Sequence, residues 1–285
     1  MVSELKVVLL VGKLYICATP IGNLEDVTIR LLNTLNQVDT IACEDTRHTV
    51  KLLNYYQIKK PLISYHAHSH QEREDYIIEK ILKGENIAYV SDAGMPGISD
   101  PGEALVKKAI LQAIDIEVIP GPSAVITALA ISGLDTSSFL FLGFLPTKTK
   151  KRRSVLASIA NMEHTVIIYE APHRLLASLN DINDELGDSR PIVVARELTK
   201  KFEEIKRGTV KELLEYYSEV VPKGEICILI GKAEEKEEVE FAQIIEEVKM
   251  LIAAGVDKKE AFKIKASEYS VKKSLIYNYF VQNED

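Results

Sequence analysis

The sequence predicts an α/β protein with two α/β domains of similar size and a small helical domain at its end. Short apolar runs alternate with stretches of helical periodicity up to about residue 230, and this alternation favours doubly wound, mostly parallel sheets. Pro120-Gly-Pro122 interrupts the series near its middle, and an acidic stretch at 234–240 precedes a segment with helical patterns alone. We therefore expect domains at 1–122, 123–233 and 240–285.

In the first half, five apolar runs predict strands, and polar stretches between them predict helices. Asp26 is expected to cap a helix that runs to about residue 36. A helix is also expected from Glu103 to about Ile114. The predicted strands are residues 14–18, 40–43, 62–64, 87–90 and 117–119.

The second half repeats the pattern after an apolar helix that begins at Ser123. Its predicted strands are residues 139–142, 165–169, 192–195 and 226–230, with helices near 151–161, 173–186 and 210–217. In the last segment Gly255 separates the first two of three short helices, and Ser270 is expected to cap the third. These helices are predicted at 241–254, 258–269 and 271–281.

The loop at 89–102 is the most informative stretch of the chain. It follows an apolar run, holds three glycines and two prolines, and includes the acids Asp92 and Asp100 before a helical pattern begins. Such a loop lies at the carboxyl edge of a sheet, where open α/β folds bind ligands. Glycines let the backbone approach a ligand closely, and prolines stiffen the rest. The alternative is an ordinary tight connection between a strand and a helix.

Composition and charge exclude several classes of protein. A net charge of −7 argues against indiscriminate nucleic-acid binding, although a local basic patch remains compatible with it. The three cysteines, Cys17, Cys43 and Cys227, are too few and too scattered for a disulfide framework or a zinc motif. No apolar run approaches the roughly 20 residues of a membrane span, so we expect a cytoplasmic protein with no membrane contact.

The common nucleotide-binding patterns are missing. The chain has no G-x-G-x-x-G after a strand and no G-x-x-x-x-G-K-[ST]. A dinucleotide-dependent dehydrogenase and a P-loop nucleotidase are therefore disfavoured.

Polar loops follow several predicted strands in both halves. Those at 19–23, 44–48 and 91–100 are expected to converge at one sheet edge, because the carboxyl ends of parallel strands share an edge. Those at 169–174 and 196–200 follow strands of the second half. If the two rims face each other, they form a cleft between the domains.

The loop at 44–48 combines acids, an arginine and a histidine. A carboxylate or histidine there can accept a proton, and Arg47 can hold a phosphate through two parallel hydrogen bonds. Alternatively, Asp45 or Thr46 caps the following helix and Arg47 pairs with Glu44. His173 and Arg174 carry the same ambiguity.

No metal site is expected. His66, His68 and His70 alternate in a stretch that reads as a loop, and no carboxylate or cysteine joins them before Glu72. Surface histidines are the simpler interpretation.

Two basic stretches stand out in an acidic protein. The first holds five positive charges and is either a solvated helix face or a phosphate-backbone contact: Lys148, Lys150, Lys151, Arg152 and Arg153. The second lies in the tail and includes Lys272 and Lys273, with tyrosines nearby. The tail is either a helix-turn-helix-like nucleic-acid module or a bundle for dimerisation or capping.

Seven stretches, in this order and spacing, resemble the bacterial small-subunit ribosomal RNA methyltransferases of the tetrapyrrole-methylase (class III) superfamily. They are residues 15–26, 43–47, 91–102, 120–124, 141–146, 169–174 and 195–200. The resemblance covers roughly residues 13–233, the tail looks like the small helical domain of that family, and residues 1–12 lie outside the match.

The resemblance implies methylation by S-adenosyl-L-methionine of the ribose 2′-hydroxyl of a cytidine in the decoding region of 16S ribosomal RNA. It also implies a 30S ribosomal subunit as partner, a homodimer, and a cofactor held between two α/β domains. A methylase of tetrapyrroles or other small molecules is the main alternative. A binding protein that senses the cofactor and a structural assembly factor are two further ones.

The residues implied for the cofactor follow from the family pattern position by position. They are Pro20 in the first loop, Asp92, Ala93, Gly94 and Ile98 in the glycine-rich loop, Ser123 and Ala124 at the next helix, and Glu170 and Leu198 later. Porphyrin enzymes carry Gly-Gly-Asp where this chain has Asp92-Ala93-Gly94, so the backbone of that loop is the better-supported part.

The acceptor side is a hypothesis from the position of the polar loops. Glu44 or Asp45 would assist deprotonation of the hydroxyl, and Arg47 with His173 or Arg174 would hold the neighbouring phosphate. Lys200 would lower the pKa of the hydroxyl through its charge.

Overall fold

The computed structural model of the protein describes residues 11–66, 71–233, 241–269 and 271–282. The chain forms two compact units, Met1–Ala233 and Glu234–Asp285. None of the helices in the described ranges is long and apolar enough to span a membrane.

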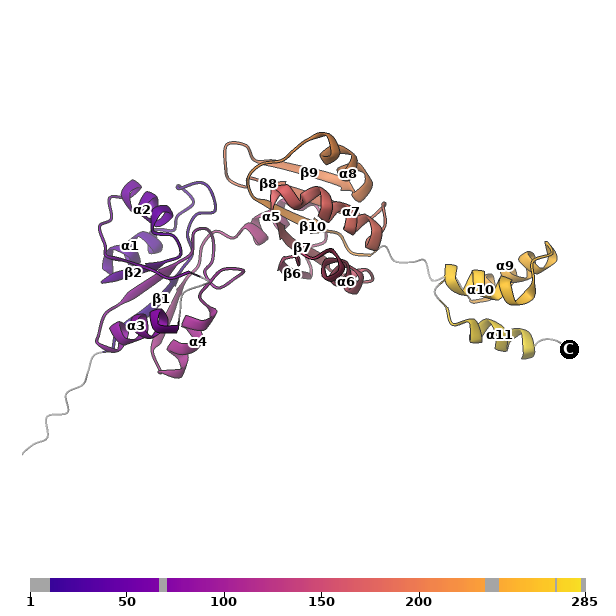
Figure 1. The fold of residues 1–285 in the computed structure, drawn as a ribbon, viewed down its shortest axis with the longest axis horizontal. Helices are drawn as coiled ribbons and strands as arrows, with labels where there is room; N and C mark the ends of the chain where they lie inside the picture. The colour runs from indigo at the N-terminus through magenta and orange to yellow at the C-terminus, as the bar shows by residue number, and fades with distance from the viewer. Residues whose placement is uncertain (1–10, 67–70, 234–240, 270, 283–285) are drawn as a thin grey trace, which may run out of the picture. The chain divides into compact units, whose positions relative to one another are not determined.

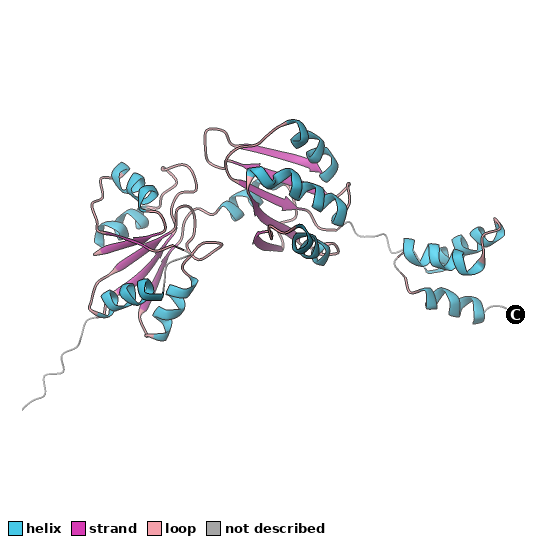
Figure 2. Cartoon of the chain, viewed as in Figure 1, coloured by secondary structure: helices cyan, strands magenta, loops and turns pink. Residues whose placement is uncertain are grey.

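The first sheet of the larger unit is entirely parallel, as predicted (Figures 1 and 2). Its strand order is β3-β2-β4-β1-β5. Strand β4 is buried along its whole length. The strands are β1 (Lys13–Cys17), β2 (Thr40–Cys43), β3 (Leu62–Ser64), β4 (Ile87–Val90) and β5 (Asp115–Ile119).

Helices cover both faces of this sheet (Figure 1). Leucines of α1 (Ile29–Gln37) and α2 (Thr46–Tyr55) pack into one apolar cluster with Cys17, Ile41 and Val90. Residues of α3 (Gln71–Leu82) and α4 (Glu103–Leu111) pack into another cluster on the opposite face. The sheet is therefore buried on both sides, as parallel sheets require.

Two predicted helix ends are wrong in detail. The side chain of Thr28, not Asp26, caps α1, where its Oγ1 accepts a hydrogen bond from the backbone N–H of Leu31 at 3.0 Å. Helix α4 ends at Leu111 rather than near Ile114, because Ala113 has a φ of +52° and turns the chain into β5. A left-handed residue of this kind commonly ends a helix.

The second sheet is mixed, with order β6-β7-β10-β8-β9. Only β6 and β7 run parallel, and each of the other three pairs is antiparallel. Strand β9 was not predicted from the sequence. The strands are β6 (Phe139–Phe144), β7 (Thr165–Glu170), β8 (Pro191–Arg196), β9 (Glu204–Thr209) and β10 (Ile226–Ile230).

Helices pack on both faces of the second sheet, one on the face that meets the first half of the chain and three on the opposite face. Helix α5 (Ala124–Ser132) packs with Ile167, Val193 and Leu229, and Ile21 of the first half joins this cluster. The opposite face is covered by α6 (Thr149–Ile159), α7 (Leu175–Leu186), which follows the short 3₁₀ turn η1 (Pro172–Arg174), and α8 (Val210–Glu219).

In its described residues the smaller unit contains three helices around their own apolar cluster, α9 (Phe241–Ala253), α10 (Lys258–Glu268) and α11 (Lys273–Gln282). Gly255, with a φ of +90°, lies between the first two helices, as predicted. Glu247 of α9 accepts hydrogen bonds from Lys265 at 2.7 Å and from the Tyr269 hydroxyl at 2.6 Å. The predicted cap at Ser270 lies outside the described residues.

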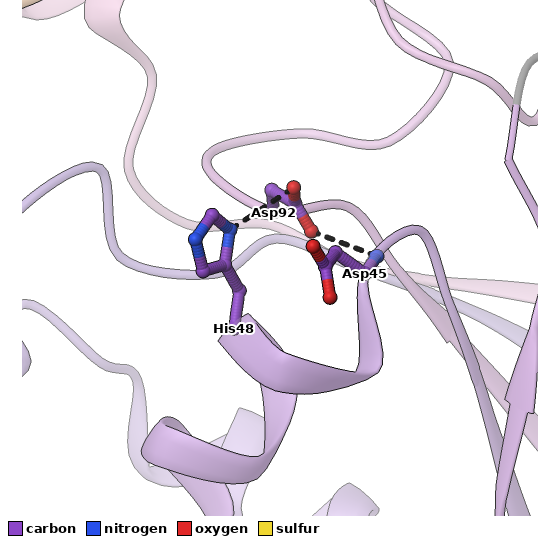
Figure 3. Close-up of side chains that lie close together, drawn as sticks. All are labelled: Asp45, His48 and Asp92. Atoms are coloured by element: carbon purple, nitrogen blue, oxygen red, sulfur yellow. Dashed lines mark hydrogen bonds and ion pairs between the residues drawn. The ribbon is translucent and has the colours of Figure 1, made fainter.

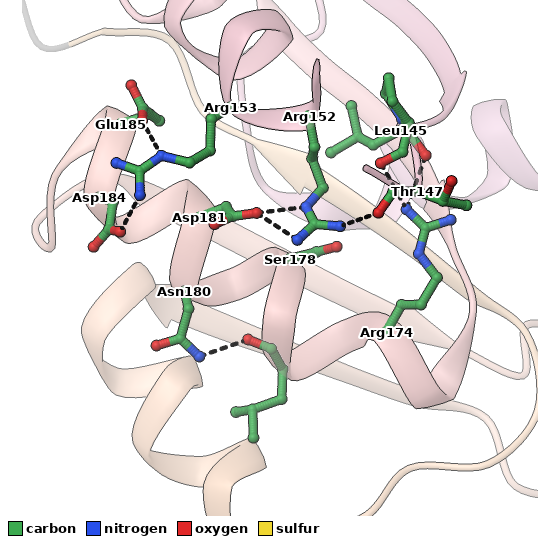
Figure 4. A network of polar contacts seen from close by, with 12 residues as sticks. Leu145, Thr147, Arg152, Arg153, Arg174, Ser178, Asn180, Asp181, Asp184 and Glu185 are labelled. Atoms are coloured by element: carbon green, nitrogen blue, oxygen red, sulfur yellow. Dashed lines mark hydrogen bonds and ion pairs between the residues drawn. The ribbon is translucent and has the colours of Figure 1, made fainter. Parts of the chain in front are cut away.

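The predicted basic stretch at 148–153 divides into a buried and an exposed part. Arg152 lies on the same helical stripe as the buried residues Leu156 and Ile159, and its side chain is 6% exposed. Its Nε donates a 2.6 Å hydrogen bond to Asp181 of α7 (Figure 4). The prediction that Arg152 contacts RNA is therefore wrong, because the guanidinium is enclosed between two helices.

The other four cations of the stretch are more accessible. Arg153 reaches Glu185 at 2.6 Å and Asp184 at 3.0 Å and is partly exposed (Figure 4). Lys148, Lys150 and Lys151 are exposed.

Because Arg152 is buried and Arg153 is partly exposed, we expect their alanine variants to lose different amounts of unfolding free energy. Arg152→Ala leaves the buried Asp181 carboxylate without its partner and should lower the free energy of unfolding by about 3–5 kcal/mol. Arg153→Ala removes two partly exposed pairs, each worth about 0.2–1 kcal/mol, and should cost less than about 2 kcal/mol. Urea unfolding of both variants measures the difference, and equal costs would contradict the buried pair.

Gly102 fixes the end of the glycine-rich loop against Tyr89. It has a φ of +133°, and a Cβ there would lie 2.5 Å from Cε1 of the buried Tyr89 ring. The Tyr89 hydroxyl donates a 2.6 Å hydrogen bond to the Pro101 carbonyl, which holds the ring in place.

A comparison of two alanine substitutions tests this position. Gly133 also has a positive φ, +79°, but a Cβ there would meet no atom of the described residues within 4 Å. We expect Gly133→Ala to cost about 1–2 kcal/mol from backbone strain alone. Gly102→Ala should cost about 1–3 kcal/mol more, because the ring must move and because a φ of +133° is less accessible to alanine than the left-handed region. Thermal and urea unfolding of the pair test this, and equal losses would show that the ring yields freely.

Candidate functional site

The loops after β1, β2 and β4 converge at the carboxyl edge of the first sheet, as predicted. Thr19 and Gly94 exchange two backbone hydrogen bonds of 2.9 and 3.1 Å. The backbone N–H of Asp45 donates to Oδ1 of Asp92 at 3.0 Å. Strands β1 and β4 are neighbours whose connections leave toward opposite sides of the sheet, so this edge is a topological switch point.

Loops of the second half meet this edge directly. The Thr199 side chain accepts a 3.1 Å hydrogen bond from the backbone N–H of Asn23. Gly22 makes this approach possible, because a Cβ there would lie 2.5 Å from Cγ of Lys200. The backbone also turns sharply at this contact, where Thr199 has a φ of +65°.

A cavity of about 350 Å³ lies between the two rims. Its size is within the range of small-molecule sites. Both halves contribute residues, so the predicted cleft is present within the larger unit. The lining includes Ile21, Ala93, Gly94, Met95, Ile98, Ser99, Asp100, Ser123, Ala124, Phe144, Tyr169, Glu170, Leu198 and Glu225.

Most residues that the family resemblance implied for the cofactor line this cavity. They are Ala93, Gly94, Ile98, Ser123, Ala124, Glu170 and Leu198. Pro20 is not in the lining but is buried between Thr19, which pairs with Gly94, and Ile21, which is in the lining. It therefore positions the loop.

Asp92 also lies outside the lining and turns toward α2 (Figure 3). Its Oδ2 lies 3.1 Å from Nδ1 of His48, in addition to the bond with the Asp45 backbone. Its carboxylate thus joins two loops of the rim. These side chains are partly or well exposed and are satisfied by one another, so we assign no ligand to them.

The cavity is acidic. Asp100, Glu170 and Glu225 line it, whereas its lining, as far as the structure describes it, contains neither lysine nor arginine. Burial raises the pKa of Asp100 to about 6, with a further contribution from the nearby Glu44 charge. Burial also raises the pKa of Glu44, and Asp92 adds to this shift. The sequence shows Asp100 as an acid of the loop but gives no sign of this environment.

Glu170 and Arg174 serve the architecture of the second rim. The Glu170 carboxylate is buried and accepts hydrogen bonds from Ser178 and from the backbone N–H of Ala171. Arg174 pairs with it at 3.2 Å and donates to the Leu145 carbonyl at 2.8 Å. Arg174 is thus tied to the fold, while the neighbouring His173 is exposed.

The other predicted acceptor-side residues surround the cavity without lining it. Asp45 caps α2 by accepting from Arg47 N at 2.8 Å, which confirms one alternative, but Arg47 pairs with Asp45 and not with Glu44. The hydrogen bonds from Arg47 lower the pKa of Asp45 to about 2.

Lys200 is likewise engaged, with Nζ 2.8 Å from Glu197 and 3.0 Å from Glu225. Burial lowers the pKa of Lys200, but the hydrogen bonds to these two carboxylates outweigh this effect and raise it. Glu44, Asp45, Arg47, His173, Arg174 and Lys200 all lie outside the cavity lining.

Sequence reasoning did not assign several residues of the lining. Met95, Ser99, Phe144 and Tyr169 line the cavity but received no role. Ser99 has a φ of +60° and is close to Gly143 of the opposite rim. A contact of this kind between two loops leaves no pattern in one sequence.

The comparisons with known proteins agree with this architecture. Residues 13–214 match the family model of the tetrapyrrole (corrin/porphyrin) methylases. Among solved structures, a cobalt precorrin-4 methyltransferase has a TM-score of 0.58 at 20% identity, over 77% of this chain and 94% of its own. The uroporphyrin-III C-methyltransferase of Thermus thermophilus, solved with S-adenosyl homocysteine, has a TM-score of 0.55 at 18% identity, over 78% and 98%. At these identities the likeness shows the fold.

Curated relatives are much more similar. The ribosomal RNA small subunit methyltransferase I of Synechocystis is 46% identical over 96% of this chain and 99% of its own length. The proteins of the same name from Halalkalibacterium halodurans and Bacillus subtilis are 46% and 42% identical, over 95% and 94% of each chain. The chain therefore belongs to the tetrapyrrole methylase family, within the group of the ribosomal RNA small subunit methyltransferase I proteins.

Proposed function

We propose that the protein transfers a methyl group from S-adenosyl-L-methionine to 16S ribosomal RNA in the 30S subunit, at the ribose 2′-hydroxyl of a cytidine in the decoding region. The observation that carries the proposal is the acidic cavity between the two rims, which lies where the family pattern implied a cofactor. The names of the full-length relatives support a small-subunit ribosomal RNA substrate.

The residues present fit this methyl donor. S-adenosyl-L-methionine carries a sulfonium and an amine, so carboxylates such as Asp100 and Glu225 favour it, and apolar walls such as Ile98 and Leu198 suit its adenosine. The lack of lysine and arginine in the described lining disfavours a phosphate-bearing cofactor. When bound, the donor supplies an electrophilic methyl group.

Asp100 is the best candidate for the base on the acceptor side. It lines the cavity and its pKa of about 6 lies close to neutral pH, where a base acts most effectively. Asp45 is less suitable, because its pKa is lowered to about 2 by Arg47. Glu44 lies outside the lining and acts on Asp100 through its charge.

Exposed lysines provide the contacts for RNA. Lys148, Lys150 and Lys151 lie at the amino end of α6, whose first turn has no acidic residue. Cations are unfavourable at this positive end of a helix. Their presence there is accounted for by a polyanionic partner.

The same proposal extends to the tail and to the assembly. Lys272 and Lys273 are exposed at the beginning of α11 and are proposed as a second phosphate contact. A homodimer and a cytoplasmic location are expected for an enzyme of this kind. A tetrapyrrole or other small-molecule methylase is the alternative, and it gives the exposed lysines no role.

The first test is methyl transfer itself. Purified protein with tritiated S-adenosyl-L-methionine should label unmethylated 30S subunits, and ribose-methylation mapping should place the product at one cytidine of the decoding region. Uroporphyrinogen III serves as the small-molecule control. Label in the porphyrin and none in RNA would support the alternative. Label on a base rather than a ribose would overturn the 2′-hydroxyl assignment.

The second test uses Asp100→Asn and has two readouts. The pKa of the carboxyl is about 6 in the folded protein, above the roughly 3.9 of an unfolded chain, so folding favours its protonated form. The wild type should therefore lose stability as pH rises from about 4 through 6. Asp100→Asn should melt higher than the wild type at pH 8, and this gain should vanish near pH 4.

Turnover should change in the opposite direction. Without the base, methyl transfer at pH 8 should fall by about 10²–10⁴-fold even at concentrations of S-adenosyl-L-methionine that saturate the variant by calorimetry. Wild-type turnover should itself decrease below about pH 6 as Asp100 becomes protonated. If Asp100→Asn were more stable than the wild type and fully active, Asp100 would not be the base.

A further inference from the structure

Phe144 is an exposed aromatic residue at the mouth of the cavity. Its side chain lines the cavity, yet the residue is 57% exposed. Tyr169, the other aromatic residue in the described lining, is only partly exposed. Single exposed apolar residues are common, but Ile98, which also lines the cavity, is 54% exposed, so apolar surface is open to solvent at this entrance.

A bulge in β6 places Phe144 on the cavity side of the sheet. Phe141 pairs with Ile167 and Phe144 with Tyr169, so three steps along β6 match two along β7. Without the extra residue, position 144 would face the opposite side, because side chains alternate along a strand. Gly143 accommodates the bulge with a φ of +64°.

The ring is held in a defined position. Phe144 contacts Tyr169 edge to face at 5.6 Å between centroids, and Tyr169 contacts Phe141 in the same way at 5.0 Å. Ser99 of the glycine-rich loop lies close to Gly143. A Cβ atom at position 143 would be 2.8 Å from the Ser99 Oγ. The Phe144 ring is therefore held by Tyr169 and remains more than half exposed, and the backbone beside it lies close to Ser99 of the other rim.

We propose that Phe144 is the stacking platform for the base of the target nucleotide, which presents the attached ribose to the cavity. The inference rests on the proposed function and adds the residue that positions the substrate. Unpaired bases of RNA are commonly held by stacking on aromatic side chains. The exposed Lys148 and Lys150 follow Phe144 by four and six residues, and we expect them to contact the phosphates next to a base stacked on the ring.

The adenine of the methyl donor is the other aromatic group in the reaction. The exposed position of Phe144 on the rim favours the base of the RNA, which arrives from solvent. If the ring stacks on the RNA base, its loss weakens binding of 30S subunits. If it stacks on the adenine, its loss weakens binding of S-adenosyl-L-methionine, and the test measures both.

The test compares Phe144→Leu and Phe144→Tyr with the control Phe139→Leu. Phe139 is an exposed ring on the same strand that lies outside the cavity lining. Phe144→Leu should raise the KM for 30S subunits on the order of tenfold, the effect expected from loss of one stacking contact. The calorimetric Kd for S-adenosyl-L-methionine should stay within about twofold.

The matched variants exclude a general effect of the surface. Phe144→Tyr keeps the ring and should restore the KM, and Phe139→Leu should behave as the wild type. A weakened Kd for S-adenosyl-L-methionine with an unchanged KM for 30S subunits would assign the ring to the donor and overturn the inference. An unchanged KM and Kd would remove the ring from substrate binding.

A second measurement does not depend on the folding of the leucine variant. A photoreactive benzoylphenylalanine at position 144 should crosslink to 16S ribosomal RNA in 30S subunits, and the same group at position 139 should not. Crosslinks at 144 to ribosomal proteins alone, or none, would contradict the inference. A wild-type protein that methylates no RNA would refute the proposed function itself, and this outcome is separate from a negative result at Phe144.

Discussion

The backbone pairing between Thr19 and Gly94 is the interaction on which the site depends. It joins the loops after β1 and β4 at the point where the sheet connections diverge. A hydrogen bond from Asp45 to Asp92 adds the loop after β2. Once these three loops are fixed, Ile21 reaches the apolar cluster of the second sheet, and Asn23 meets Thr199 across the rim. The cavity is the space that remains between these contacts.

The strands and the converging loops were predictable because they rest on local patterns. Buried parallel strands such as β4 appear as continuous apolar runs, and the glycines and prolines that follow restrict the backbone in a recognisable way. The polar loops could be placed at one edge because parallel strands share their direction. Strand β9 escaped prediction because its sequence, Glu204–Thr209, is polar and only partly buried at the edge of the sheet.

The functions of single side chains were less predictable, because they depend on contacts between distant parts of the chain. Arg152 looked like a surface cation in its basic run, but α7 supplies Asp181 as its partner. Thr28 rather than Asp26 caps α1, a choice that depends on local backbone geometry. Asp100 became a candidate base only when the fold placed Glu44 near it and half-buried both. Burial of a side chain and its distance from other charges leave no pattern in the amino-acid sequence.

The distribution of charge explains how an acidic protein can act on RNA. With a net charge of −7, the protein as a whole repels a phosphate backbone, and screening limits that repulsion to about 8–10 Å at physiological salt. The carboxylates of the cavity suit a cationic methyl donor, whereas the exposed lysines of α6 begin four residues after Phe144. The proposed phosphate contacts are thus local, at the exposed lysines of α6 near the entrance and at Lys272 and Lys273 of the tail. A substrate held there by a few phosphates still needs a contact that positions an unpaired base at the cavity. The proposed stacking on Phe144 serves this purpose for any base, and it does not depend on net charge.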